Sequence, residues 1–256
     1  MISTQEQQIG EILQEYLPTI EIENSILKGN LLDESVKEFI VSNSNAFVIG
    51  LISDQSVKAE IAWSLPYRLS ERLNTFDFDY IINELSVDYI ENIIKEKPAL
   101  HRYPHKIAIY IYEAMKKIIE EYSGDASNIW NNQSADVIID RLEEFKGISH
   151  KKASLGTLLL IRDLDMDISN KSAIDIAYDV HIRRIFLRLG LVDKDTMENV
   201  LLSARRINPD FPGNLTTSFW TIGRKYCYAT DPNCEECPLN ECCKEHKLVY
   251  KKKVGV

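Results

Sequence analysis

The chain of 256 residues is 45% hydrophobic and carries a formal net charge of −9. Its length suits one large or two small domains; no apolar run approaches the ~20 residues that span a bilayer, and residues 1–6 lack the regions of a signal peptide, so we expect neither a membrane protein nor a secreted one. The negative net charge argues against nucleic-acid binding by the surface as a whole, because phosphate contacts need Lys and Arg. Local charge decides which partner binds, however. The basic residues gather at 146–152, 183–188, 205–206 and 224–225.

Helical periodicity dominates the chain. Apolar residues recur at steps of three and four in six stretches, namely 9–17, 47–69, 107–119, 137–142, 153–160 and 182–189. Most glycines and prolines fall between these stretches, where they would end helices. Alternating strand patterns are scarce, so the sequence predicts an all-α fold.

A helical hairpin is predicted between residues 135 and 160. Residues 136–144 have the pattern of one helix, residues 145–149 contain a break with a glycine, and a second helix begins at His150. Free backbone N–H groups in such a turn can bind an anion such as a DNA phosphate. The same pattern also fits a plain structural corner, and the hairpin alone leaves both interpretations open.

Residues 162–171 interrupt the helical pattern with a polar, acidic stretch. Asp163, Asp165 and Asp167 alternate as in a calcium-binding loop, but the glycine and the distal glutamate of that loop are missing. We therefore expect a solvated loop here.

All five cysteines lie in the last quarter of the chain, and four of them follow the spacing Cys227-x6-Cys234-x2-Cys237-x5-Cys243. Four thiolates on a short loop can enclose one metal centre. A zinc ribbon usually has two Cys-x2-Cys knuckles, whereas the uneven arms here favour a [4Fe–4S] cluster, with structural zinc as the alternative. Cys242 could replace Cys243, although its shorter arm fits less well. Clustered thiolates also favour a reducing cytoplasm.

Together these features resemble the helix-hairpin-helix DNA glycosylase superfamily, in particular its endonuclease III branch. The resemblance covers about residues 47–243. Its hairpin segment, Phe145-Lys-Gly-Ile-Ser-His-Lys-Lys-Ala153, is similar to the family's Leu-Pro-Gly-Val-Gly-Arg-Lys-Thr-Ala. Downstream, Tyr178-Asp-Val-His-Ile-x-Arg184 is similar to Val-Asp-Thr-His-Ile-x-Arg, and Gly223-Arg-Lys-Tyr-Cys227 leads into the cysteines. A weaker piece is Ile52-Ser-Asp-Gln-Ser-Val57, similar to Leu-Ser-x-Gln-x-Thr.

By this resemblance Lys151 takes the place of the catalytic lysine and Asp179 that of the catalytic aspartate. A damaged base must leave the duplex before an enzyme reaches its sugar. A carboxylate would then stabilise positive charge on the deoxyribose, and a neutral amine would attack the sugar carbon to form a Schiff base that leads to strand cleavage by β-elimination. Lys152 is the alternative nucleophile if the hairpin is offset by one residue. Without the resemblance, Lys151 also fits a solvated surface charge, and Asp179 a helix cap.

The resemblance also implies residues that contact DNA. Gln55 and Arg102 are expected to be wedge residues that fill the duplex where the base leaves; Arg102 stands where the family's Gly-Leu-Tyr-x-x-Lys-Ala has leucine. Further contacts are expected from Lys146, Gly147, Ser149, Lys152 and Arg184.

Three departures from the family concern the substrate more than the reaction class. Ser149 replaces the second hairpin glycine, and Lys146 replaces a proline. The 28 positions between Lys151 and Asp179 exceed the family norm, and the acidic stretch 162–171 would absorb the excess.

We therefore predict two helical domains with a cleft between them: a bundle with the hairpin at 46–160, and an iron–sulfur domain built from 1–45 and 161–256. The predicted function is a base-excision repair glycosylase with abasic-site lyase activity, acting on an oxidised or deaminated pyrimidine in double-stranded DNA. The expected protein is a cytoplasmic monomer, associated with the nucleoid if prokaryotic. A monofunctional glycosylase for alkylated bases or mismatched thymine or uracil, and a non-catalytic DNA-binding or redox-sensing module, are the alternatives.

Overall fold

The computed structural model describes residues 2–20, 23 and 25–246, and these residues form helices and loops without a strand. The prediction of an all-α fold is confirmed. The chain divides into two compact units: Ser25–Ser169, called here the bundle unit, and Met1–Asn24 with Asn170–Val256, called the cysteine unit. Among the described residues, no helix is both long and apolar enough to cross a membrane.

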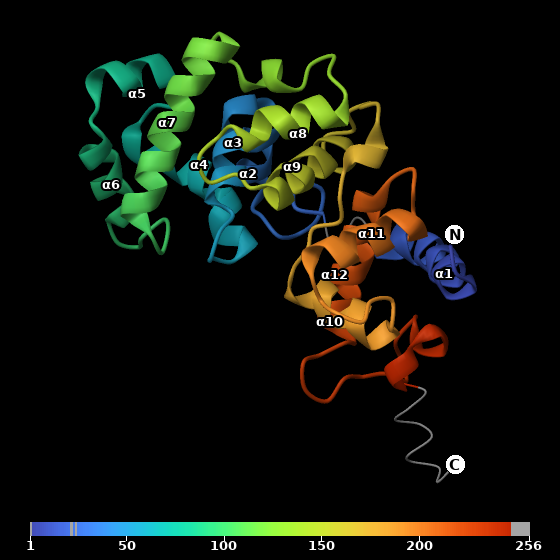
Figure 1. Cartoon of the computed structure of the whole chain (residues 1–256). Helices are drawn as coiled ribbons and strands as arrows, with labels where there is room; N and C mark the ends of the chain where they lie inside the picture. The colour runs from blue at the N-terminus through green and yellow to red at the C-terminus, as the bar shows by residue number, and fades with distance from the viewer. Residues whose placement is uncertain (1, 21–22, 24, 247–256) are drawn as a thin grey trace. The chain divides into compact units, whose positions relative to one another are not determined.

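The bundle unit contains eight of the described α-helices. They are α2 (Glu34–Ser42), α3 (Ser44–Ser53), α4 (Ala59–Leu73), α5 (Phe78–Glu84), α6 (Val87–Lys95), α7 (Pro104–Tyr122), α8 (Ala135–Glu143) and α9 (His150–Arg162), with a 3-10 helix at Ala126–Ile129 (Figure 1).

Helix α3 is the centre of the bundle unit. Its residues from Ala46 to Ser53 are all fully buried, as expected for a helix that is apolar on every face. The side chain of Asn43 caps its first turn by accepting a hydrogen bond from the backbone N–H of Ala46. A Cβ at Gly50 would lie 2.8 Å from the ring of Trp63, so glycine lets α3 and α4 approach closely. Gln55 follows directly after Asp54, the C-cap of α3.

The cysteine unit joins the two ends of the chain. It contains α1 (Thr4–Ile20), α10 (Val180–Leu189), α11 (Met197–Ile207) and α12 (Leu215–Lys225), with 3-10 helices at Lys171–Ala173, Pro212–Asn214 and Asn240–Cys242. In Figure 1, α1 is blue and lies in the same unit as the orange and red C-terminal elements.

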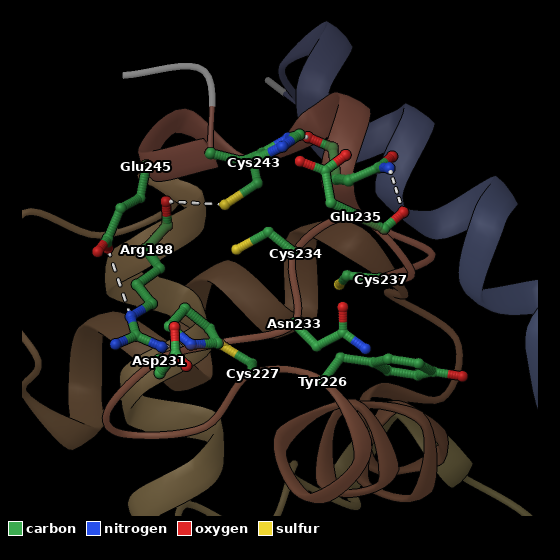
Figure 2. A pocket seen from close by; sticks show the side chains of 13 residues that line it. Arg188, Tyr226, Cys227, Asp231, Asn233, Cys234, Glu235, Cys237, Cys243 and Glu245 are labelled. Atoms are coloured by element: carbon green, nitrogen blue, oxygen red, sulfur yellow. Dashed lines mark hydrogen bonds and ion pairs between the residues drawn. The ribbon is translucent and has the colours of Figure 1, made fainter. Parts of the chain in front are cut away.

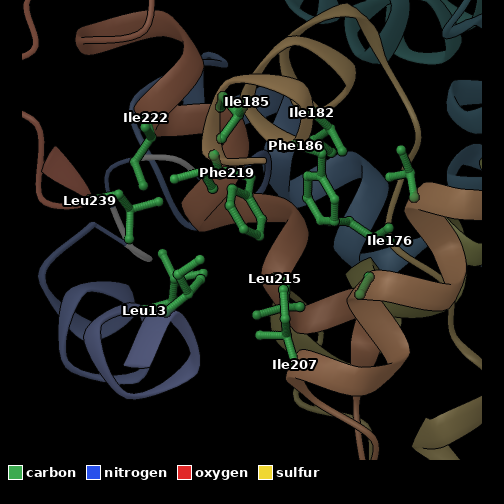
Figure 3. Close-up of a cluster of buried hydrophobic side chains, with 14 of the residues drawn as sticks. Leu13, Ile176, Ile182, Ile185, Phe186, Ile207, Leu215, Phe219, Ile222 and Leu239 are labelled. Carbon is green, nitrogen blue, oxygen red and sulfur yellow. The ribbon is translucent and has the colours of Figure 1, made fainter. Parts of the chain in front are cut away.

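A single hydrophobic cluster holds the cysteine unit together (Figure 3). The rings of Phe186 in α10 and Phe219 in α12 lie 4.9 Å apart, and both side chains are fully buried. Leu13 brings α1 to the same cluster, and Leu239 brings the cysteine loop. The side chain of Gln5 also donates to the backbone oxygens of Leu189 and Cys242, so α1 is hydrogen-bonded directly to the loop region.

The observed units differ from the predicted bounds, since residues 25–45 and 161–169 belong to the bundle unit. Helix α2 packs against α3 and α4, and polar bonds hold the segment before it. The Asp163 carboxylate accepts hydrogen bonds from the backbone N–H groups of Ile26 and Leu27 at 3.0 and 3.1 Å, and Lys28 pairs with Asp165 at 2.6 Å. The acidic stretch is therefore tied to the segment before α2, with Asp163 buried in place of the solvated position we expected.

Candidate functional site

The predicted hairpin forms in the bundle unit. Helix α8 ends at Glu143 and α9 begins at His150, as the sequence indicated. Phe145 and Ile148 anchor the turn because both side chains are almost fully buried, and the Ile148 N–H donates to the oxygen of Phe145. Gly147 has φ +89°, a left-handed conformation that favours glycine.

Replacing Gly147 by alanine is expected to destabilise the bundle unit by about 2–5 kcal/mol, because the new Cβ is strained at positive φ and overpacks the site. It would lie 2.5 Å from the ring of Tyr110. Gly124→Ala is the matched control, since Gly124 has φ +79° with nothing within 4 Å and adds only the backbone strain of about 1–2 kcal/mol. Urea unfolding curves measure both. Equal losses would show that close packing against Tyr110 does not explain the glycine.

The turn presents backbone donors. Within the described residues, the N–H groups of Gly147, Ser149 and Lys151 have no hydrogen-bond acceptor. Ser149 is the N-cap of α9 but its side chain makes no capping bond. These donors lie at the positive end of a 13-residue helix, an arrangement suited to an anion.

The two adjacent lysines of α9 have different surroundings. Lys151 is exposed, whereas Lys152 is half-buried and its ammonium donates to the backbone oxygens of Ile52 and Gly147, at 2.9 Å each. Burial lowers the pKa of Lys152 to about 8. Lys152 therefore faces the protein interior, in contrast to the predicted DNA contact, and this geometry favours Lys151 over Lys152 as the accessible amine.

The end of α3 lies against the same turn through Lys152. Gln55 is half-buried, and its side-chain amide donates to the oxygen of Ile52 at 2.8 Å. The neighbouring carboxyl of Asp54 has a raised pKa, because burial disfavours its charged form more than Lys152 favours it.

A buried histidine joins the Arg102 segment to α3. The backbone N–H of Tyr103 donates to Nδ1 of His101 at 3.0 Å, so Nε2 carries the proton and donates to the oxygen of Ser53 at 3.2 Å. Burial lowers the pKa of His101, which keeps the ring neutral. Arg102 itself is exposed, with its guanidinium 5.5 Å from the ring centroid of Tyr103.

Lys146, a predicted DNA contact, forms an ion pair with Glu113. Its ammonium lies 2.7 Å from Oε1 of Glu113, in a partly exposed position. Its side chain is exposed, so this weak surface pair leaves the ammonium accessible beside the hairpin turn, and a DNA contact by Lys146 stays a prediction.

In the cysteine unit, Asp179 is the N-cap of α10. Its Oδ1 accepts hydrogen bonds from the backbone N–H groups of His181 and Ile182 at 2.9 and 2.8 Å. Two donors on one oxygen fix the half-buried carboxylate and leave Oδ2 for another partner. Asp179 and Lys151 belong to different units, and their meeting on one sugar stays a prediction.

Arg184 is used inside the cysteine unit. Its guanidinium donates to the oxygens of Cys227 and Gly223 at 2.8 and 3.1 Å and lies 3.0 Å from Nδ1 of His181. These bonds hold α10 against the start of the cysteine loop, and the phosphate contact of Arg184 stays a prediction. A Cβ at Gly223 would lie 2.5 Å from that of His181, so glycine permits this approach.

Cys227, Cys234, Cys237 and Cys243 line one cavity of about 320 Å³ (Figure 2). Arg188 also lines it and donates to the sulfur of Cys227 at 3.3 Å. Among the described residues, no three His, Cys, Asp or Glu side chains form a group that could hold a single metal ion. Cys242 lies apart in the hydrophobic cluster and is almost fully buried.

Three of the four thiols are harder to ionise than a free cysteine. Burial raises the pKa of Cys237 to about 11 and also raises the pKa values of Cys234 and Cys243, to which the charges of neighbouring thiolates add. A bound cation would offset both effects, because metal ligation requires the thiolate.

Comparison with known proteins gives the following matches. The chain is 34% identical to the endonuclease III of Thermotoga maritima over 73 residues, covering 28% of this chain and 34% of that protein. It is 27% identical to the endonuclease III of Bacillus subtilis over 165 residues, covering 64% of this chain and 66% of that protein. The matches thus span about a third and just under two thirds of these relatives' lengths. No protein-family model matches the chain.

Solved structures match over almost the whole chain. A trapped covalent intermediate of endonuclease III with DNA superposes with a TM-score of 0.66 at 20% identity, covering 98% of this chain and 100% of that one. A thermostable thymine-DNA glycosylase superposes with a TM-score of 0.65 at 10% identity, covering 95% and 97%. At these identities the likeness concerns the fold.

Proposed function

We propose that the chain is a member of the endonuclease III-like helix-hairpin-helix superfamily, whose endonuclease III proteins it resembles in sequence and fold, and that it excises a damaged base from double-stranded DNA and nicks the strand at the resulting abasic site. The observation that carries this proposal is the glycine hairpin of α8 and α9. It presents an exposed lysine, Lys151, directly beside free backbone donors suited to a phosphate. Both groups that the reaction needs from this unit, an anion site and an amine, therefore lie within a few residues of each other.

Binding is supported by the hairpin and the two wedge candidates. The N–H groups of Gly147 and Ser149 would hold a DNA phosphate without reading sequence. Gln55 and Arg102 would fill the space of the flipped base; Arg102 is exposed, and Gln55 would first release its bond to Ile52.

The chemistry assigns one step to each catalytic candidate. Asp179 would stabilise positive charge on the deoxyribose while the C1′–N bond breaks and the base leaves with a proton. The neutral amine of Lys151 would bond to C1′ and give a Schiff base as the ring opens. Loss of a proton from C2′ and departure of the 3′ oxygen with the C3′–O bond pair would then cleave the strand, and water would release Lys151.

The four cysteines would hold a [4Fe–4S] cluster. All four cysteines line one cavity, and their spacing lacks the two Cys-x2-Cys knuckles of a zinc ribbon, which favours a cluster over a single tetrahedral ion. When bound, the cluster would cross-link the loop and supply no bond-making chemistry. Arg188 would donate to a ligand sulfur, and Arg184 would hold the loop to α10.

Replacing any one of the four cavity cysteines by alanine is expected to reduce bound iron and visible absorption by more than half in the purified protein. Cys242→Ala is the control and should retain both, because Cys242 packs in the hydrophobic cluster. Metal analysis and absorption spectra measure the effect. Stoichiometric zinc with no iron after anaerobic purification would contradict the cluster assignment.

The substrate is proposed as an oxidised or deaminated pyrimidine, and the site of action as DNA in the cytoplasm. The test is incubation of the purified protein with duplexes that each carry one lesion or an abasic site, with borohydride added to trap a Schiff base. A covalent adduct and a nicked strand are expected. Base release without any adduct would favour the monofunctional alternative. The fold is also similar to that of a thymine-DNA glycosylase. Binding without either activity would contradict both.

A further inference from the structure

The last turn of α3 connects three segments of the bundle unit through buried polar bonds. The oxygen of Ile52 accepts from Lys152, and Lys152 also donates to the oxygen of Gly147 in the hairpin turn. The oxygen of Ser53 accepts from His101, which in turn binds the backbone of Tyr103. These carbonyls form the negative end of the α3 dipole, where cations and N–H donors are favoured.

We propose that Lys152 is a positioning residue, whose ammonium clamps the hairpin turn to the end of α3 and thereby holds Gln55 and Lys151 in register. This inference rests on the proposed function, since it assumes that Gln55 and Lys151 act on one DNA site. Both bonds of the clamp are 2.9 Å long, and they join backbone atoms 95 positions apart in the sequence.

The effect of Lys152 on the free energy of folding distinguishes a positioning residue from a residue that stabilises the core. Burial lowers the pKa of Lys152 from 10.5 to about 8, so the folded protein loses this proton before the unfolded chain does. This contribution to folding stability therefore rises between about pH 8 and 10.5, and below that range the charge is a net cost. A buried charge that costs stability is expected where function requires it, because apolar replacements are often neutral or stabilising.

The charges around the clamp are mixed. Asp54 at the end of α3 favours the ammonium, whereas Lys106 of α7 and the neighbouring Lys151 oppose it. His101 is neutral and contributes a bond without a charge. Removing the ammonium relieves its desolvation and the repulsion from two lysines, while it releases the oxygens of Ile52 and Gly147 and loses the attraction of Asp54, so the net change in stability should be small.

The test compares two variants. Lys152→Met keeps a long unbranched side chain and loses the ammonium N–H donors, whereas Lys152→Gln keeps two N–H donors without a charge. Lys95→Met, at the end of α6, is the control. For Lys152→Met we expect a Tm within about 4 °C of wild type or higher, and a single-turnover trapping rate on abasic duplex at least tenfold lower, since small misplacements of a reacting group are costly. Lys152→Gln should recover part of the rate.

Hydrogen exchange in the free protein separates this proposal from the proposed function. The N–H groups of Gln55 and Ile148 are bonded on either side of the clamp, to the oxygens of Ser53 and Phe145. Lys152→Met should speed exchange at both, and leave α11 unchanged. If the wild-type protein gave no trapped adduct but Lys152→Met still showed these exchange changes, the lyase proposal would be contradicted and the clamp proposal would stand.

Three results would overturn the clamp. One is an unchanged trapping rate in Lys152→Met with unchanged exchange at Gln55 and Ile148. Another is a rate loss that Lys152→Gln does not relieve although both variants fold. The third is loss of the folded state in both variants, which would show that Lys152 stabilises the core.

Discussion

Replacing Lys151 by alanine is expected to abolish the borohydride-trapped adduct with abasic duplex and to lower strand nicking at least a thousandfold. Only a primary amine can form the Schiff base from which β-elimination proceeds, and alanine offers none. Lys151 is an exposed lysine in the first turn of α9, so its loss should leave the fold intact. Denaturing gels after reduction measure the adduct, and the same gels without borohydride measure nicking.

The neighbouring lysine makes this experiment specific. Lys95→Ala, a change of the same type in the same unit, should trap as wild type does. An adduct that survives in Lys151→Ala and disappears in Lys152→Ala would move the nucleophile by one position and contradict the assignment. In that case Lys152 would have to leave its two carbonyl partners before it could react.

The sequence predicted the hairpin well because its signals are local. Gly147 is the residue that the turn requires at positive φ, and Phe145 and Ile148 supply buried anchors on either side. The cysteine spacing is equally local, and its four predicted ligands do line one cavity. Both features depend on residues close in the chain, where spacing and turn chemistry restrict the geometry.

Side-chain orientation was harder to predict. Lys151 and Lys152 differ by one step of about 100° around a helix, and that step turns one to solvent and the other toward the oxygen of Ile52, which is 100 residues away in the chain. Arg184 was predicted as a phosphate contact, and no sequence pattern indicated that its guanidinium also donates to oxygens of α12 and of the loop that follows. No local pattern reports a partner so distant.

The bounds of the bundle unit were also hard to predict, because they depend on contacts between residues far apart in the chain. Residues 25–45 join it because α2 packs against α3 and α4, and because the Asp163 carboxylate accepts hydrogen bonds from two backbone N–H groups before α2. In the sequence, Asp163 stands in an acidic stretch that looks solvated. Only the fold shows that it is buried and that the stretch links the two ends of this unit.

Asp179 is predicted to act both as a helix cap and as a catalytic carboxylate, and Asp179→Asn separates the two roles. Asparagine caps a helix about as well as aspartate does, because its side-chain oxygen can accept from the N–H groups of His181 and Ile182 in the same way. The folding stability should therefore change by less than about 0.5 kcal/mol. Base excision should nevertheless slow by roughly 100- to 1000-fold, because the negative charge that opposes the developing positive charge on the sugar is lost.

Two further variants measure the contribution of the helix cap alone. Asp179→Ala should lose the cap as well, at a cost of about 1 kcal/mol, and its excision rate should be no better than that of Asp179→Asn. Thr196→Ala removes another N-cap of the cysteine unit, the one that accepts from the N–H of Asn199, and it should cost similar stability while base excision continues. Single-turnover base release and thermal unfolding give both quantities for each variant. An excision rate in Asp179→Asn within threefold of wild type would reduce Asp179 to a cap, since the one property removed, the charge, would then have no effect on the sugar.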